Sequence, residues 1–249
     1  MLTEERRRTI LDRLEEHGKV VAAELVELLG VSEDTVRRDL RELSAQGLLH
    51  RVHGGALPAA PSRGGFAERL QLAPERRAAL AEAALPLLEG ATVIILDGGT
   101  TAAELARRLP RDRACTVLTN APPVATALAA HPRAEVVLLG GRLLKREQVT
   151  VGAATVDALR RVRADVAVLG VCSLHVEAGV TALEREEAEV DRAMVDAAGE
   201  VVALASADKL GTVSPWLVAG LEDITHVVTD GDADATAQLE QAGVAVVRA

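Results

Sequence analysis

Residues 31–56, VSEDTVRRDLRELSAQGLLHRVHGGA, constrain the fold of this chain more than any other stretch. Ser32 predicts the start of a helix, because its hydroxyl can accept from the free amides of a first turn. Gly47 predicts the end of that helix, because glycine readily adopts the left-handed conformation found there. Three apolar residues recur at helical spacing and predict a buried stripe: Val36, Leu40 and Leu43.

Positive charge lies on a different face of the same helix. Successive residues turn by roughly 100°, so Arg37, Arg38 and Arg41 fan out away from the apolar stripe. A shorter helix over residues 21–29 comes first, and Gly30 begins a tight connection. Two helices joined by a short glycine turn, the second one cationic, are typical of a helix-turn-helix.

A short ribbon follows the second helix. Residues 48–53 alternate roughly as a strand and end in Gly54 and Gly55, which suits a β-wing beside the reading helix. Arginines on an amphipathic helix are also common on faces that only meet solvent. The order of cap, turn, cationic helix and wing favours DNA binding instead. Three wing residues could then reach a phosphate or the minor groove: His50, Arg51 and His53.

On these residues the block resembles the N-terminal signature of DeoR-family bacterial transcriptional regulators. A regulator of this kind has double-stranded operator DNA as its partner. Arg37 and Arg38 are candidates for base edges or adjacent phosphates, and Arg41 and Arg51 for phosphates. The full set of DNA-binding candidates is Ser32, Thr35, Arg37, Arg38, Arg41, Arg51 and His53.

Charge and composition limit how the chain can bind nucleic acid. The net charge is −9, and residues 1–57 hold more carboxylates than cations, which argues against a nonspecific polyanion binder. We therefore expect site-focused binding with weak, salt-dependent nonspecific affinity. Aromatic residues make up 1% of the chain, which argues against recognition of single strands by base stacking.

The cysteines and the apolar runs indicate the compartment. Cys115 and Cys172 lack metal-ligand spacing, which favours reduced thiols in a cytosolic protein. No apolar run reaches transmembrane length, and the N-terminus does not resemble a signal peptide. We expect a cytoplasmic protein with no membrane partner, no cofactor, no metal and no catalytic residue.

The organisation of the chain changes twice. We expect a winged helix-turn-helix over residues 1–57, a linker rich in Pro, Gly, Ser and Ala over 58–73, with 66–72 ambiguous, and an α/β domain over 74–249. Apolar strands alternate with helices in the last part, which predicts a doubly wound sheet. The strands are expected at residues 92–96, 116–118, 135–139, 165–169, 201–205, 226–229 and 244–247.

A second candidate site follows the first of these strands. DGGTT, residues 97–101, joins a buried strand to a helix N-terminus, where backbone amides and hydroxyls can hold a phosphate. A tight turn capped by threonine is the plainer interpretation. Other strand ends should meet the same rim, since ligands of such sheets bind at the carboxyl ends of the strands. Lys209 follows one of them and could supply a cation, or it could be a solvated loop lysine.

The motifs LDGGTT, LTN, LLGGRL, VTVG and ADKLG occur in the same order as in the effector domain of DeoR-family regulators. The resemblance implies a fold shared with ribose-phosphate isomerase and glucosamine-phosphate deaminase, and a phosphorylated sugar or related metabolite as effector. The family often has Asp-Ser-Ser before this lysine, whereas this chain has Ser206, Ala207 and Asp208. The implied effector-binding residues are Asp97, Gly98, Gly99, Thr100, Thr101, Thr119, Asn120, Gly140, Gly141, Gly152, Glu187 and Lys209.

The interpretation that accounts for both sites is a DNA-binding transcriptional regulator of carbohydrate or related metabolic genes. We expect a repressor relieved by its effector, because the resembling family mostly represses, although no residue decides against an activator. A dimer or tetramer is expected, since operators are palindromic or repeated. The alternative is an enzyme acting on sugar phosphates, with Asp97, Glu187 and Asp208 as acid–base groups, which would leave the N-terminal block unexplained.

Overall fold

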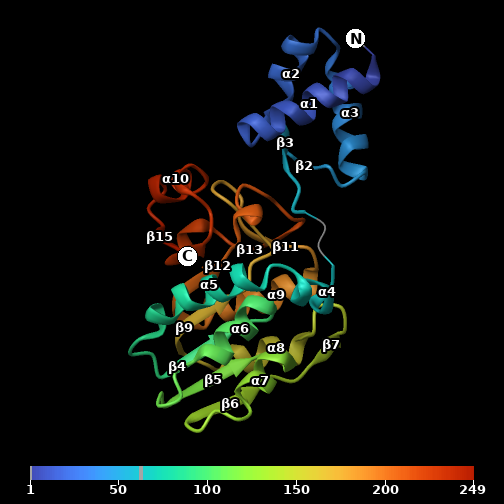
Figure 1. Cartoon of the computed structure of the whole chain (residues 1–249). Helices are drawn as coiled ribbons and strands as arrows, with labels where there is room; N and C mark the ends of the chain where they lie inside the picture. The colour runs from blue at the N-terminus through green and yellow to red at the C-terminus, as the bar shows by residue number, and fades with distance from the viewer. Residues whose placement is uncertain (1, 62–63) are drawn as a thin grey trace.

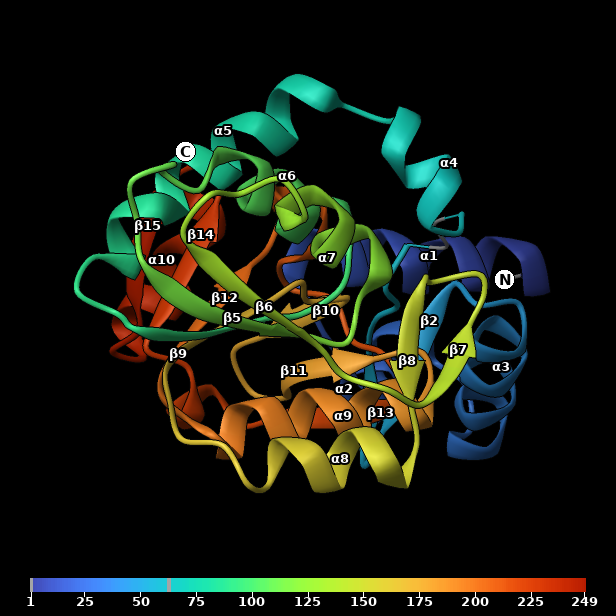
Figure 2. The ribbon, with the colours of Figure 1, turned by 90° about the horizontal axis from the view of Figure 1, so that it is seen from below.

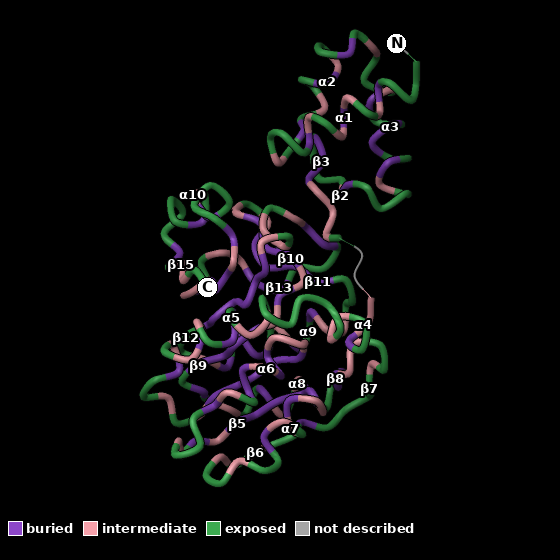
Figure 3. The backbone as a smooth tube through the Cα atoms, in the orientation of Figure 1, coloured by how far each residue is buried: buried purple, intermediate pink, exposed green. Residues whose placement is uncertain are grey.

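The computed structural model describes residues 2–61 and 64–249. Its described part has two separate hydrophobic cores, a small one between residues 10 and 56 and a large one between residues 66 and 247. The N-terminal domain stands above the sheet domain, with the connecting chain between them (Figure 1). Buried positions concentrate on the central strands and on the inner sides of the surrounding helices (Figure 3).

The N-terminal domain is a winged helix-turn-helix, as predicted. Its elements are α1 (Thr3–His17), β1 (Val20–Val21), α2 (Ala22–Leu29), α3 (Glu33–Ala45), β2 (Leu49–Val52) and β3 (Gly55–Pro58). Strand β3 pairs antiparallel with both β1 and β2. The predicted stripe of Val36, Leu40 and Leu43 packs in the small core. The first helix is capped at Leu2, whose backbone amide donates to Glu5 at 3.0 Å.

The signals that delimit α3 act as the sequence predicts. The Ser32 hydroxyl accepts from the Thr35 amide at 3.4 Å. Gly47 is left-handed, with a φ of +74°, and the Leu48 amide donates back to the Leu43 carbonyl at 3.1 Å. Glycine tolerates that φ because it has no Cβ.

The chain between the two domains is not uniform. It contains the short helix α4 (Phe66–Gln71), and Phe66 packs in the large core. Ser62 and Arg63, which belong to the expected linker, lie outside the described residues. In the part of the chain that the structure describes, no helix is long and apolar enough to cross a bilayer.

The sheet domain is built on seven parallel strands, which confirms the doubly wound prediction. Their order is β15-β14-β12-β9-β4-β5-β6, so successive connections reverse direction between β4 and β9. Helices α5, α6 and α7 cover one face and α8 and α9 the other (Figure 2). The strands are β4 (Val93–Leu96), β5 (Cys115–Thr119), β6 (Ala134–Leu138), β9 (Ala164–Leu169), β12 (Ala198–Leu204), β14 (His226–Thr229) and β15 (Ala245–Arg248). The helices are α5 (Pro74–Ala84), α6 (Thr100–Arg108), α7 (Pro122–Leu128), α8 (Ala153–Leu159), α9 (Arg185–Asp196) and α10 (Ala233–Gln241), with 3₁₀ turns η1 (Leu85–Leu88), η2 (Ala207–Lys209) and η3 (Leu221–Asp223).

Two antiparallel additions were not predicted. Strands β7 (Arg142–Leu144) and β8 (Val149–Val151) form a hairpin beyond β6. Strands β10 (Ser173–His175), β11 (Gly179–Ala182) and β13 (Trp216–Ala219) form a small sheet. These strands are three or four residues long, too short to display a clear period in the sequence.

Candidate functional site

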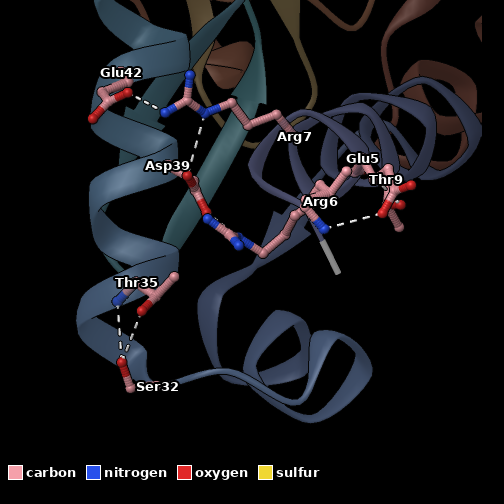
Figure 4. A network of polar contacts seen from close by, with 9 residues as sticks. Glu5, Arg6, Arg7, Thr9, Ser32, Thr35, Asp39 and Glu42 are labelled. Carbon is pink, nitrogen blue, oxygen red and sulfur yellow. Dashed lines mark hydrogen bonds and ion pairs between the residues drawn. The ribbon is translucent and has the colours of Figure 1, made fainter.

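A buried ion-pair network fixes which side of α3 faces outward. Asp39 is 1% exposed and accepts from Arg6, and from Arg7 Nε at 3.2 Å, both on α1 (Figure 4). Arg7 also pairs with Glu42, one turn further along α3. Because these carboxylates point toward α1 and the apolar stripe packs in the small core, the remaining surface of α3 is turned to solvent. Sequence reasoning missed this network, since Asp39 stands inside a run of charged residues.

The predicted arginines lie on the outward side of α3. Arg37, Arg38 and Arg41 are all exposed. Arg37 pairs with Glu33 at 2.6 Å, but both side chains are more than half exposed, so the pair is weak and can yield to a phosphate. Within the described residues, Arg38 and Arg41 have no ion pair. The helix therefore presents an outward row of guanidinium groups.

The other DNA-binding candidates divide between the cap and the wing. The Ser32 and Thr35 hydroxyls lie 3.0 Å apart, so both take part in the cap of α3. Arg51 and His53 are exposed on the β2–β3 hairpin, whose turn is His53-Gly54. The hairpin sits close against β1: a Cβ added to Gly55 would lie 2.0 Å from the Val20 carbonyl oxygen.

The 97–101 loop lies at the switch point of the sheet, where the β4 and β9 ends are neighbours. Asp97 is 4% exposed and accepts from the Gly170 amide at 3.0 Å through Oδ2, while Oδ1 is buried without a hydrogen-bond partner among the described residues. Gly98 has no room for a side chain, because a Cβ there would lie 2.2 Å from Val149 Cγ1. Gly99 is left-handed, with a φ of +102°, and begins α6.

Thr100 and Thr101 are half-buried in the first turn of α6. Thr119 and Asn120, at the end of β5, are fully buried beside this turn. The Thr119 hydroxyl accepts from the Ala121 amide at 3.1 Å, and the Asn120 amide group donates to the Thr150 carbonyl at 3.2 Å. The Asn120 side-chain oxygen is buried with no partner in the described part of the chain.

The remaining glycines lie further out along the sheet edge. Gly140 and Gly141 are exposed after β6, and the Gly140 carbonyl accepts from the Thr155 hydroxyl at 2.7 Å. A Cβ on Gly141 would meet that same hydroxyl at 2.3 Å. Gly152 precedes α8. In this structure the three glycines serve the packing of α8 and β8.

Glu187 belongs to a cluster of carboxyl groups that sequence reasoning did not anticipate. Burial, then the negative charges of Asp97 and Glu147, raise the pKa of Glu187 to about 8. Burial also raises the pKa of Asp97 to about 6, against the stabilising amides of Gly98 and Gly170. Burial, then the charges of Asp97 and Glu187, raise the pKa of Asp191, whose Oδ1 has no described partner. We call Asp97, Glu187 and Asp191 the carboxyl cluster.

Two cations act on this cluster. Burial and the backbone amides have the largest effects on the pKa of Asp97. The positive charges of Lys209, which is half-buried in η2, and of Arg69 in α4 then lower this pKa, because they favour the charged carboxylate. Arg69 was not predicted. Asp208, which was considered as an acid–base group, instead faces Arg76 at 3.6 Å on the exterior of the domain.

The arrangement can hold a ligand that is anionic at one end and donates hydrogen bonds at the other. Amides and hydroxyls of the 97–101 turn and Lys209 suit an anion. The side-chain oxygens of Asp97 and Asn120 that lack a partner among the described residues can accept from donors such as hydroxyl groups, since buried acceptors are otherwise satisfied. Within the described residues, no group of three or more His, Cys, Asp or Glu is placed to hold a metal ion.

Two family models match the chain. The DeoR-like helix-turn-helix domain matches residues 6–60, and the DeoR C-terminal sensor domain matches residues 73–231. Together they cover both regions described above.

Relatives with known names align over nearly the whole chain. The HTH-type transcriptional regulator GlpR of Haloferax volcanii is 37% identical over 99% of this chain and 98% of its own length. The glycerol-3-phosphate regulon repressor of Escherichia coli is 27% identical over 91% of this chain and 90% of its own. Among solved structures, ribose 5-phosphate isomerase from Methanocaldococcus jannaschii overlaps 54% of this chain and 53% of its own, with 17% identity and a TM-score of 0.39.

Proposed function

The chain belongs to the DeoR family of transcriptional regulators, and we propose that it represses metabolic genes by binding operator DNA until a phosphorylated sugar or related metabolite binds. Residues 1–57 would bind DNA, 58–73 connect, and 74–249 sense the metabolite in the cytoplasm. The observation that carries the proposal is the outward row of Arg37, Arg38 and Arg41, set opposite the buried Asp39.

DNA recognition follows from the orientation of α3. With its inner side held by α1, the helix can enter a major groove while Arg51 of the wing reaches the flanking backbone. Arg37 and Arg38 would contact base edges or adjacent phosphates, and Arg41 a phosphate. One domain presents only one such helix, so a palindromic or repeated operator requires at least a dimer.

The metabolite would bind at the switch point. Its phosphate would take the amides and hydroxyls of residues 98–101 and the charge of Lys209, and its hydroxyls would donate to Asp97 and Asn120. Repression can be relieved only if the metabolite prefers the state that binds DNA less well. This demands a physical connection between the sheet domain and α3.

The test is a gel-shift titration of DNA from upstream of the gene, with the wild-type protein and Arg37→Ala. If Arg37 reads a base, the variant loses about 1–3 kcal/mol of specific affinity. If it contacts a phosphate, affinity falls for all sequences and the salt slope drops by about 1. Arg111→Ala, an exposed arginine between α6 and β5, is the matched control. Equal operator affinity of wild type and Arg37→Ala would remove α3 from the interface.

A further inference from the structure

Arg69 connects the inter-domain helix α4 with the candidate effector site. Its guanidinium pairs with Glu147 at 2.5 Å and donates to the Gly64 carbonyl at 3.2 Å. The Arg69 and Glu147 side chains are 24% and 16% exposed, so the pair is largely shielded from solvent. Arg69 can therefore exchange Glu147, its carboxylate partner, for another anion that offers better hydrogen-bond geometry.

The position of this pair places it at the rim of the 97–101 loop. Glu147 lies in the β7–β8 turn, two residues before Val149, whose side chain packs against Gly98. Helix α4 itself packs against α6, the helix that begins within the 97–101 loop. Burial is the largest influence on the pKa values of Asp97 and Glu187, and it raises both. The positive charge of Arg69 lowers both pKa values and so opposes this rise.

Charge balance at the site requires a second cation. The raised pKa values keep Glu187 and Asp191 mostly protonated at neutral pH, so the negative charge beside the loop comes from Asp97 and from a bound phosphate, which adds up to two further charges. Lys209 alone cannot offset these. A guanidinium fork suits a phosphate better than a lysine does, because it can donate two parallel hydrogen bonds.

Both cations are attached to the chain that leaves the wing. Beyond β3, the Val213 amide donates to the Pro58 carbonyl at 2.9 Å, and the Ala60 amide donates to the Val213 carbonyl at 3.0 Å. Val213 lies four residues after Lys209. Further along, α4 is held by the Phe66 amide, which donates to the Arg146 carbonyl at 2.8 Å. Movement of either cation is therefore transmitted to the inter-domain chain.

We propose that Arg69 is an effector-binding residue, which exchanges Glu147 for the phosphate of the ligand, and that α4 thereby transmits occupancy of the site to the DNA-binding domain. This inference rests on the proposed function. It adds a ligand contact that comes from the inter-domain segment rather than from a strand end of the sheet.

Substitutions of Arg69 and of Glu147 should change ligand affinity in opposite directions. Calorimetric titrations of the full-length protein would use inorganic phosphate, glycerol 3-phosphate, fructose 1-phosphate and glucose 6-phosphate. Arg69→Gln should weaken the probe that binds wild type best by about 10- to 100-fold, because a charge-assisted contact is lost. Glu147→Gln should tighten it, because the competing carboxylate is removed. Arg107→Gln, at an exposed arginine that pairs with Glu104 on α6, should change nothing.

Operator binding is then measured with and without the same probe. The wild-type operator Kd should rise with the probe, and for Arg69→Gln the ratio of the two Kd values should approach one even at probe saturation. Tighter binding by Glu147→Gln excludes general destabilisation as the cause, since misfolding cannot improve affinity. Unchanged binding by Arg69→Gln, with wild type still responsive, overturns this inference alone. A wild type that binds no probe overturns the effector proposal as well.

Discussion

Asp39→Ala should unfold the DNA-binding domain while the sheet domain stays intact. Asp39 is 1% exposed and is the partner of Arg6, which is itself buried, and of the partly covered Arg7. Removing one member of a buried pair costs about 3–5 kcal/mol, because the other charge is left uncompensated. Arg7 keeps Glu42, so the lower end, about 3 kcal/mol, is expected. A domain of this size has only a few kcal/mol to lose.

Hydrogen exchange followed by mass spectrometry on the full-length protein separates the two domains. A loss of about 3 kcal/mol lowers amide protection in α3 about 100-fold. The fluorescence of Trp216, the one tryptophan in the sequence, reports on the sheet domain and should not change. Asp34→Ala, an exposed carboxylate in the first turn of α3, should cost less than about 1 kcal/mol.

A double variant sharpens the test. Arg6→Met combined with Asp39→Leu replaces the ion pair by apolar side chains and should recover most of the lost stability. If Asp39→Ala lowers α3 protection no more than Asp34→Ala does, the pair is effectively solvent-screened, and the account of how α3 is oriented is wrong.

Two further predictions concern the wing and the carboxyl cluster. Gly55→Ala places a methyl group 2.0 Å from the Val20 carbonyl oxygen, so β3 must separate from β1. Operator affinity should then fall at least tenfold in a gel shift, while thermal unfolding of the sheet domain, followed by Trp216 fluorescence, stays unchanged. An operator affinity equal to that of the wild type would contradict this packing. The pKa of Glu187, raised by burial from 4.5 to about 8, means that the folded state holds a proton that the unfolded state releases, so the stability of the sheet domain should decrease as pH rises from about 4.5 to about 8. Glu187→Gln should flatten this decrease in melting temperature, and identical pH profiles for the two proteins would show that Glu187 is ionised in the folded state.

Features encoded within a few neighbouring residues were predictable. The Ser32 cap, the left-handed Gly47 and the alternation of apolar strands with helices gave the winged helix-turn-helix and the doubly wound sheet. The antiparallel strands β7, β8, β10, β11 and β13 were not predictable: each has three or four residues and none belongs to the alternation of apolar strands with helices, so tertiary packing alone makes them extended. The candidate ligand residues remain predictions; the structure shows that Asp97 and Asn120 are buried, each with one side-chain oxygen that has no partner among the described residues.

The sequence by itself determined the two kinds of domain, the arginine face of α3 and the glycine turn at the end of β4. Tertiary structure alone decided the hydrogen bonds and ion pairs between distant residues, because these residues come together only when the domains are packed. Arg6 meets Asp39 across 33 residues, Asp97 meets Gly170 across 73, and Arg69 meets Glu147 across 78. At such separations no local pattern distinguishes a buried partner from a charged residue on the surface. The charges that orient α3 and the second cation beside the 97–101 loop are therefore properties of the fold.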